Sequence, residues 1–134
     1  MSDREALVGE HAEELRYLIQ GCLTSVGYRA SGASTADELA RAVYHPGYLS
    51  ARTALLVLNA SWYRHCALAL AVAATQRREL ELGRLKLVLI HEWGTLGTLE
   101  QPQLEHCELI AMLEKPFPLG DLEQIAALEL ARVA

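Results

Sequence analysis

The sequence predicts a single α/β domain in which helices cover both faces of a doubly wound, mostly parallel β-sheet. Short apolar runs suited to buried strands alternate with segments of helical periodicity along most of the chain. This alternation is typical of βα units around a parallel sheet. A length of 134 residues allows one domain with a substantial core and is too short for two. We therefore expect residues 1–134 to form one domain.

The first half of the chain predicts two strands and two helices. Residues 6–9 are a short buried-strand candidate that ends at the polar pair Glu10-His11. In the next segment apolar side chains recur every three or four residues and predict a helix, which Gly27 ends: Leu15, Leu18, Ile19, Cys22, Leu23 and Val26. Residues 28–32 are a weaker strand candidate. Residues 35–38 fit a capping box, so a second helix is expected to begin there and to end at residues 45–47.

The second half predicts three strands and the remaining helices. The clearest strand covers residues 53–58, because a strand covered on both faces requires a continuous apolar run. A long helix is expected over residues 65–82, with an alanine-rich start. Residues 85–90 and 109–113 are the fourth and fifth strands, and residues 94–103 predict a loop and a short helix. The last helix, residues 120–132, is expected to bury these side chains: Leu122, Ile125, Ala126, Leu128 and Leu130. Five strands and about five helices therefore alternate.

Composition excludes several classes of function. The net charge is −5 and no basic cluster offsets it, so nucleic acid is not an expected partner. The first ten residues lack the apolar run of a secretory signal, and the longest apolar stretch, residues 66–74, is too short to span a membrane. Three cysteines without metal-ligand spacing indicate reduced thiols. We expect a cytoplasmic protein.

Three motifs in this order resemble the receiver domain of bacterial two-component response regulators across nearly the whole chain. Residues 6–16 with Gly27-Tyr28 look like the family's first strand, acidic pair, first helix and Gly-aromatic turn. Residues 55–59 look like the third strand that leads to the phosphoacceptor. Residues 113–117, followed by Leu122, look like the Lys-Pro-Phe turn into the last helix, and this motif is the most specific. The resemblance implies a flavodoxin-like sheet of order 2-1-3-4-5.

The resemblance also implies a degenerate phosphorylation site. Glu10 and His11 fall where the family has an acidic pair that holds Mg²⁺, and Asn59 falls on the phosphoacceptor aspartate. Lys115 alone is retained. Phosphorylation needs an ionised carboxylate nucleophile and a hard cation with oxygen ligands. Because the Asn59 amide is neutral and only Glu10 remains as a carboxylate at these positions, we expect neither a phosphoryl adduct nor a bound metal.

The residues that report phosphorylation in the family also differ here. His91 falls where a Ser or Thr is usual, and Met112 falls at the aromatic switch position. We therefore expect a pseudo-receiver that is not an enzyme, needs no cofactor and acts in signal transduction through protein contacts. By resemblance, a partner or a second copy binds the face made by the fourth helix, fifth strand and fifth helix, here residues 103–108 and 123–132.

Several alternatives remain open at this stage. Trp62, Tyr63 and Trp93 lie in two loops at the edge of the degenerate site, where they either form a partner-binding surface or fill the vacated metal pocket. The remodelled pocket could instead sense a small ligand or, through His11 or His91, pH.

Three sharper hypotheses have less support from the sequence. A metal site on Glu10 and the two histidines His11 and His91 has no known spacing signature and lacks a fourth ligand. His65 and Cys66 are adjacent on a helix and therefore do not face each other as base and nucleophile. A displaced phosphoacceptor would have to be Asp37 or Glu92, and neither follows the third strand.

Overall fold

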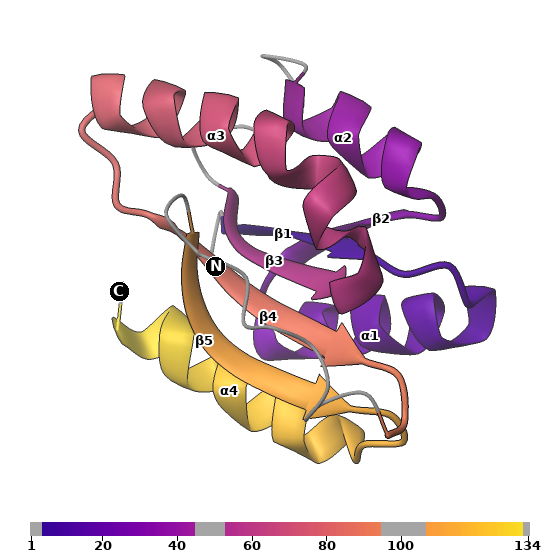
Figure 1. Cartoon of the computed structure of the whole chain (residues 1–134). Coiled ribbons are helices and arrows are strands. Elements are labelled where there is room, and N and C mark those ends of the chain that lie inside the picture. The colour runs from indigo at the N-terminus through magenta and orange to yellow at the C-terminus, as the bar shows by residue number, and fades with distance from the viewer. Residues whose placement is uncertain (1–3, 45–52, 95–106, 133–134) are drawn as a thin grey trace.

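Five parallel strands form one sheet, which helices cover on both faces (Figure 1). The computed structural model describes residues 4–44, 53–94 and 107–132. The strand order is β2-β1-β3-β4-β5, and all four pairings are parallel. The strands are β1 (Glu5–Gly9), β2 (Arg29–Ala33), β3 (Thr53–Asn59), β4 (Leu85–His91) and β5 (Cys107–Glu114). The predicted class and the predicted order 2-1-3-4-5 are confirmed.

The helices divide between the two faces of the sheet. α1 (Glu13–Val26) and α4 (Leu119–Arg132) cover one face, while α2 (Ala36–Tyr44) and α3 (Tyr63–Glu79) cover the other (Figure 1). A short 3₁₀ turn, η1 (Ala60–Trp62), joins β3 to α3. Against about five helices predicted, the described part of the chain contains four α-helices. The short helix expected at residues 94–103 lies, apart from Gly94, outside the described residues. No helix in the described ranges is long and apolar enough to cross a membrane.

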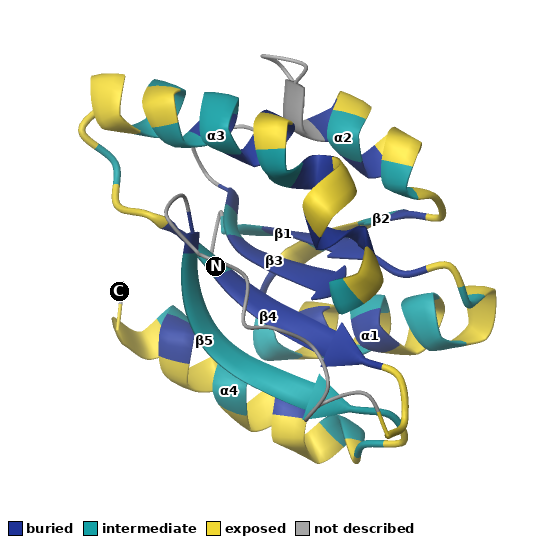
Figure 2. Cartoon of the chain, viewed as in Figure 1, coloured by how far each residue is buried: buried dark blue, intermediate teal, exposed yellow. Residues whose placement is uncertain are grey.

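The central strands separate two apolar clusters. Leu55 and Val57 of β3 point into the cluster under α1 and α4, whereas Leu56 and Leu58 point into the cluster under α2 and α3. Both sets are fully buried, and β3 and β4 are dark along their length in Figure 2. Because both faces of these strands are covered at residues 54–58 and 87–90, these positions are all apolar. This explains the continuous apolar runs in the sequence, and the ends of these runs lie close to the ends of the strands.

Two helix ends follow their predicted chemistry. Gly27 has a φ of 126°, which side chains rarely adopt, and its N–H donates to the Leu23 and Thr24 carbonyls at the end of α1. At the start of α2 the Thr35 hydroxyl accepts the Glu38 N–H at 3.1 Å. The Glu38 carboxylate reaches back to the Ser34 N–H at 3.2 Å, one residue before the expected partner in a capping box.

Two leucines that periodicity placed in the core are exposed. Leu18 is 50% exposed on α1, and Leu128 is 62% exposed on α4. The prediction was wrong at these positions because a stripe of apolar residues does not fix how the helix is rotated against the sheet. On α4 the neighbouring Glu129 is buried instead, and its carboxylate accepts a hydrogen bond from Arg132 Nη1 at 2.8 Å.

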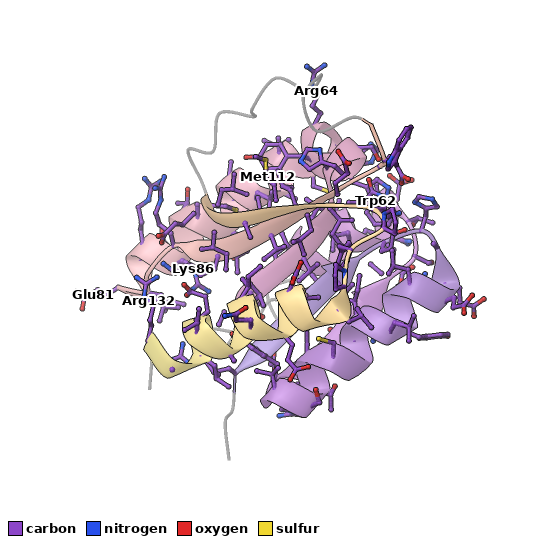
Figure 3. The ribbon with its side chains drawn as sticks, turned by 90° about the horizontal axis from the view of Figure 1, so that it is seen from below. Trp62, Arg64, Glu81, Lys86, Met112 and Arg132 are labelled. Atoms are coloured by element: carbon purple, nitrogen blue, oxygen red, sulfur yellow. The ribbon has the colours of Figure 1, made fainter. Side chains whose placement is uncertain are left out.

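Charged side chains at the helix ends are unevenly distributed along the strand direction. Each helix follows a strand and therefore begins at the carboxyl edge of the sheet. The first turns of α1, α2 and α4 carry acidic residues, and the last turns of α2, α3 and α4 carry arginines. This arrangement complements the helix dipoles. Figure 3 shows the axis of this separation, with Trp62 at the carboxyl edge and Lys86 and Arg132 toward the opposite end.

Candidate functional site

Polar residues gather where β1, β3, β4 and β5 end. Glu10 follows β1, Asn59 and His91 are the last residues of β3 and β4, and Lys115 follows β5. Parallel strands end at one edge of the sheet, and ligands of such sheets bind there. The structure places Asn59 and Lys115 each within hydrogen-bonding distance of Glu10, at the edge where we expected these residues to converge. We call this group the carboxyl-edge site.

The Glu10 carboxylate is fully buried and is the centre of the site. Its Oε2 accepts the Ala12 N–H at 2.9 Å, and its Oε1 accepts Asn59 Nδ2 at 3.0 Å. Lys115 Nζ lies 3.1 Å from both carboxylate oxygens. Arg16 Nη1 donates to the Glu10 backbone carbonyl at 3.0 Å. The negative charge is therefore compensated by an ammonium group of the same chain.

Both ends of the Asn59 side chain are engaged. Asn59 is only 1% exposed, and its Nδ2 donates to Glu10. Its Oδ1 accepts the Ser61 N–H at 3.0 Å and the Ser61 hydroxyl at 2.7 Å, which caps η1. The partners of Oδ1 are hydrogen-bond donors and the partner of Nδ2 is an acceptor. These partners therefore determine which end of the amide is oxygen and which is nitrogen. Asn59 thus acts as a neutral bridge between β1 and the turn after β3.

Lys115 joins the buried carboxylate to an exposed one. Its Nζ also donates to Glu92 Oε1 at 3.0 Å, and Glu92 is half exposed. Burial acts to lower the pKa of Lys115, but the hydrogen bonds and charges of Glu92 and Glu10 outweigh burial and hold this pKa above its usual value. The hydrogen bond from Lys115, with its charge, lowers the pKa of Glu92. Lys115 therefore remains a cation across the physiological range.

The three proposed metal ligands do not form a set. His11 Nδ1 lies 3.4 Å from Glu10 Oε2 and 3.3 Å from Asn59 Nδ2, and its side chain is 58% exposed. In the ranges that the structure describes, no group of three or more His, Cys, Asp or Glu residues could hold a metal ion. The oxygen atoms of Glu10 already have three donors.

His91 and Met112 occupy the expected positions on the last two strands. His91 is 3% exposed, and neither of its ring nitrogens has a hydrogen-bond partner within the described residues. Burial lowers the pKa of His91, against the opposing charge of Glu114, its partner in the β4–β5 register. Met112 is half buried, lies opposite Leu89 and packs against the core on the side of α2 and α3. No aromatic hydroxyl connects the site to β5 at this position.

The three aromatic candidates separate by exposure. Trp62 and Tyr63 are buried in the core cluster under α2 and α3, whereas Trp93 is 77% exposed. Gly9 makes room for the Trp62 ring, because a Cβ at Gly9 would lie 3.2 Å from Trp62 Cε3 and 3.0 Å from Leu58 Cδ1. Trp62 and Tyr63 are therefore core side chains and cannot supply a partner surface. Trp93 stays as the candidate contact.

The other nucleophile hypotheses receive no support from the geometry. Cys66 is fully buried, and burial with the charge of Asp37 raises its pKa to about 11, so its thiol stays protonated. Asp37 lies 2.6 Å from His65 Nε2, and this pair joins α2 to α3. Glu92, the other displaced-acceptor candidate, is paired with Lys115.

Two residues of the site were not assigned from the sequence. The Ser61 hydroxyl donates to the side-chain Oδ1 of Asn59, and the Arg16 guanidinium donates to the backbone carbonyl of Glu10. A serine two residues after an asparagine is a known side-chain-to-backbone pattern and could have indicated the first contact. For Arg16 the only signal was its place in the first turn of α1, from which its side chain reaches back to Glu10, three residues before the helix begins.

The sheet order, the polar carboxyl edge and the Lys115-Pro116 turn, whose peptide bond is cis, define a receiver-domain fold. Solved structures support this assignment. A response-regulator receiver domain protein from Clostridium thermocellum has a TM-score of 0.65 at 14% identity, covering 97% of this chain and 96% of that one. A CheY-like receiver domain from Methylobacillus flagellatus has a TM-score of 0.60 at 21% identity, covering 96% of this chain and 99% of that one.

The same fold also occurs within a longer solved chain. NtrX from Brucella abortus, solved in complex with ADP, has a TM-score of 0.64 at 21% identity; the match covers 97% of this chain and 26% of NtrX. No protein-family model and no curated protein matches the sequence. The fold is therefore that of response-regulator receiver domains.

Proposed function

We propose that this chain is a pseudo-receiver that acts in signal transduction by contacting a protein partner, without phosphorylation or catalysis. The observation that carries this proposal is the state of Asn59 at the end of β3. Its amide donates to Glu10 and accepts from Ser61, so the position of a phosphoacceptor is held by a neutral structural bridge.

The chemistry of the neighbouring groups supports the same conclusion. An amide has no ionised oxygen to attack phosphorus, so no acyl phosphate forms on Asn59. Phosphoryl transfer also needs a cation that neutralises the transferred group. Here the ammonium of Lys115 already compensates Glu10, the buried carboxylate of this site. A divalent cation would have to displace this ion pair, and of the family's three metal-binding positions only Glu10 would offer it a carboxylate.

Intact-mass spectrometry tests the absence of phosphorylation. The wild-type protein is incubated with acetyl phosphate and Mg²⁺, and we expect no mass increase of one phosphoryl group. The matched variant His11→Asp/Asn59→Asp restores an acidic pair and an acceptor, and it shows whether the assay detects an adduct at this edge. A phosphoryl adduct on the wild-type chain would overturn the proposal.

Exposed apolar side chains indicate where the partner binds. Trp93 is 77% exposed beside the carboxyl-edge site, and aromatic side chains of this kind supply rigid contact area at binding hot spots. Leu128 is exposed on α4, within residues 123–132 of the face proposed for a partner or a second copy. The other part of that proposed face is residues 103–108, of which residues 103–106 lie outside the described residues.

Two variants separate these surfaces. Trp93→Ser and Leu128→Ser each remove one exposed apolar side chain without opening the core. If Trp93→Ser abolishes capture of the native partner and Leu128→Ser leaves it intact, the partner binds at the carboxyl edge. The opposite result would mean that the partner binds α4. Sedimentation of Leu128→Ser against wild type tests the homodimer. Partner binding that survives both substitutions would contradict both surfaces.

The alternative of a small-ligand sensor has weaker support. An anion would need the Lys115 ammonium, which is 18% exposed and bound by two carboxylates. A ligand would therefore have to break two ion pairs before it gained any contact.

A further inference from the structure

His91 is a buried polar residue without a polar partner. It is the last residue of β4 and is 3% exposed, and neither Nδ1 nor Nε2 has a hydrogen-bond partner among the described residues. A neutral imidazole has one donor and one acceptor, and leaving both unpaired away from water is unfavourable. Such groups are rare in folded proteins and require an explanation. The pseudo-receiver role proposed above does not use this residue.

The charges around His91 differ between its neighbouring elements. On β5, Glu114 lies directly opposite in the register, and its charge favours the imidazolium. On β3, the neighbouring strand end carries the neutral Asn59. The η1 turn, residues 60–62, contains no ionisable side chain. In the turn after β5, the Lys115 ammonium is engaged by Glu10 and Glu92. Within the described residues, Glu114 is the carboxylate whose charge favours a protonated His91.

His91 is also mechanically connected to the exposed tryptophan. The His91 carbonyl accepts the Lys115 N–H at 2.8 Å, and the next residue, Glu92, is bound to Lys115 Nζ at 3.0 Å. Trp93 follows immediately. A displacement of the His91 backbone would alter the first of these bonds directly and, through Glu92, the second.

We propose that His91 is a proton-operated switch that sets the position of the Glu92–Trp93 turn. The neutral imidazole stays buried and keeps the turn as described. The imidazolium is not stable where neither ring nitrogen has an acceptor, so it moves toward Glu114 and water and carries the turn with it. This inference rests on the proposed function in one respect only, namely that Trp93 is the partner contact that the switch regulates.

NMR titration of the free protein tests the switch. The His91 ring and the Trp93 indole N–H are followed from neutral to acidic pH while the protein stays folded. We expect the Trp93 resonance to shift in one step whose midpoint equals that of His91 and lies below 6.5. The indole of Trp62, which is buried, is the internal reference and should shift less.

Three variants make the test specific. His91→Gln should abolish the Trp93 step, whereas His11→Gln, an exposed histidine at the same edge, should leave it. Glu114→Gln should lower the pH at the midpoint of the Trp93 step. This variant keeps the test valid if His91→Gln does not fold. A step that persists in His91→Gln, a Trp93 resonance that ignores His91, or protonation that occurs only on unfolding would each overturn the proposal. None of these results depends on phosphorylation or on a partner, so they do not bear on the proposed function.

Discussion

Asn59 differs from an aspartate by a single donor group, and the surrounding residues use that donor. We predict that Asn59→Asp lowers the free energy of unfolding at neutral pH by about 1–3 kcal/mol, because it replaces the bond to Glu10 with two facing carboxylates. Urea unfolding measures the change. Added Mg²⁺ should recover part of the loss in this variant and leave the wild-type protein unaffected. Stabilisation of the wild type by Mg²⁺ would contradict our view of the site.

His91 makes stability depend on pH in a defined direction. Burial lowers its pKa in the folded state below the ordinary value of 6.5. Between these two values the unfolded chain binds a proton that the folded chain does not bind. We therefore predict that the contribution of His91 to stability is fully present above pH 6.5 and is lost as the pH falls through the folded pKa.

Denaturant unfolding at pH values on both sides of that window checks this prediction. His91→Leu should flatten the dependence, since the titrating group is removed while the apolar site stays filled. His11→Leu is the matched control and should keep the slope, because its side chain is already 58% exposed. An equal slope in His91→Leu and wild type would show that another group is responsible.

The residue scale also shows where prediction from sequence stops. The meeting of Glu10, Asn59 and Lys115 follows from their positions after strands that end at one edge. The burial of Trp62 and the exposure of Trp93 do not follow from the sequence, since each residue lies only two or three positions beyond a strand end. Trp62 is buried because η1 turns it back over Gly9, and that turn depends on a contact between Ser61 and Asn59.

At the scale of elements, Arg77 fastens the end of α3 to the sheet. Its Nε donates to the Gly83 carbonyl at 2.7 Å and its Nη1 to the Thr53 carbonyl at 2.8 Å. The side chain thereby joins the α3–β4 connection to the first residue of β3. We predict that Arg77→Met destabilises the protein by about 1–3 kcal/mol, because two backbone carbonyls lose charge-assisted donors.

Arg78 provides the matched control for Arg77. It is the next residue in the same helical turn and is exposed. Arg78→Met should change the unfolding free energy by less than about 0.5 kcal/mol. Thermal or urea unfolding of the two variants measures the difference, and equal effects would mean that the two carbonyl contacts contribute little.

Strands were easier to locate from the sequence than helix faces. The buried runs of β3 and β4 were predicted to within one residue, because burial on both faces leaves no other pattern. On β5, the register with β4 shifts between Leu87 and Val88. Apolar periodicity cannot reveal such a bulge, since it inserts one residue without changing composition. Likewise, the exposure of Leu128 depends on the rotation of α4 rather than on its sequence.

At the scale of the whole molecule, the order of elements determined the fold class. Alternating strands and helices allow few topologies, because crossover connections between parallel strands are right-handed. The order 2-1-3-4-5 came from the resemblance of short motifs, and the structure confirms it. What remained hidden was a set of other contacts between distant segments, such as the Tyr28 hydroxyl donating to the Ala126 carbonyl, which joins residues 98 positions apart.

The acidic first turns of α1, α2 and α4 and the arginine-bearing last turns of α2, α3 and α4 contribute an electric dipole directed along the strands. A charged surface should therefore orient the molecule. On a cationic resin at low salt we predict adsorption through the acidic end, which shields Trp93 from acrylamide quenching, while Trp62 is shielded in both states. Added salt should release the protein and restore quenching. Unchanged quenching on adsorption would show that net charge alone governs how this protein approaches other surfaces.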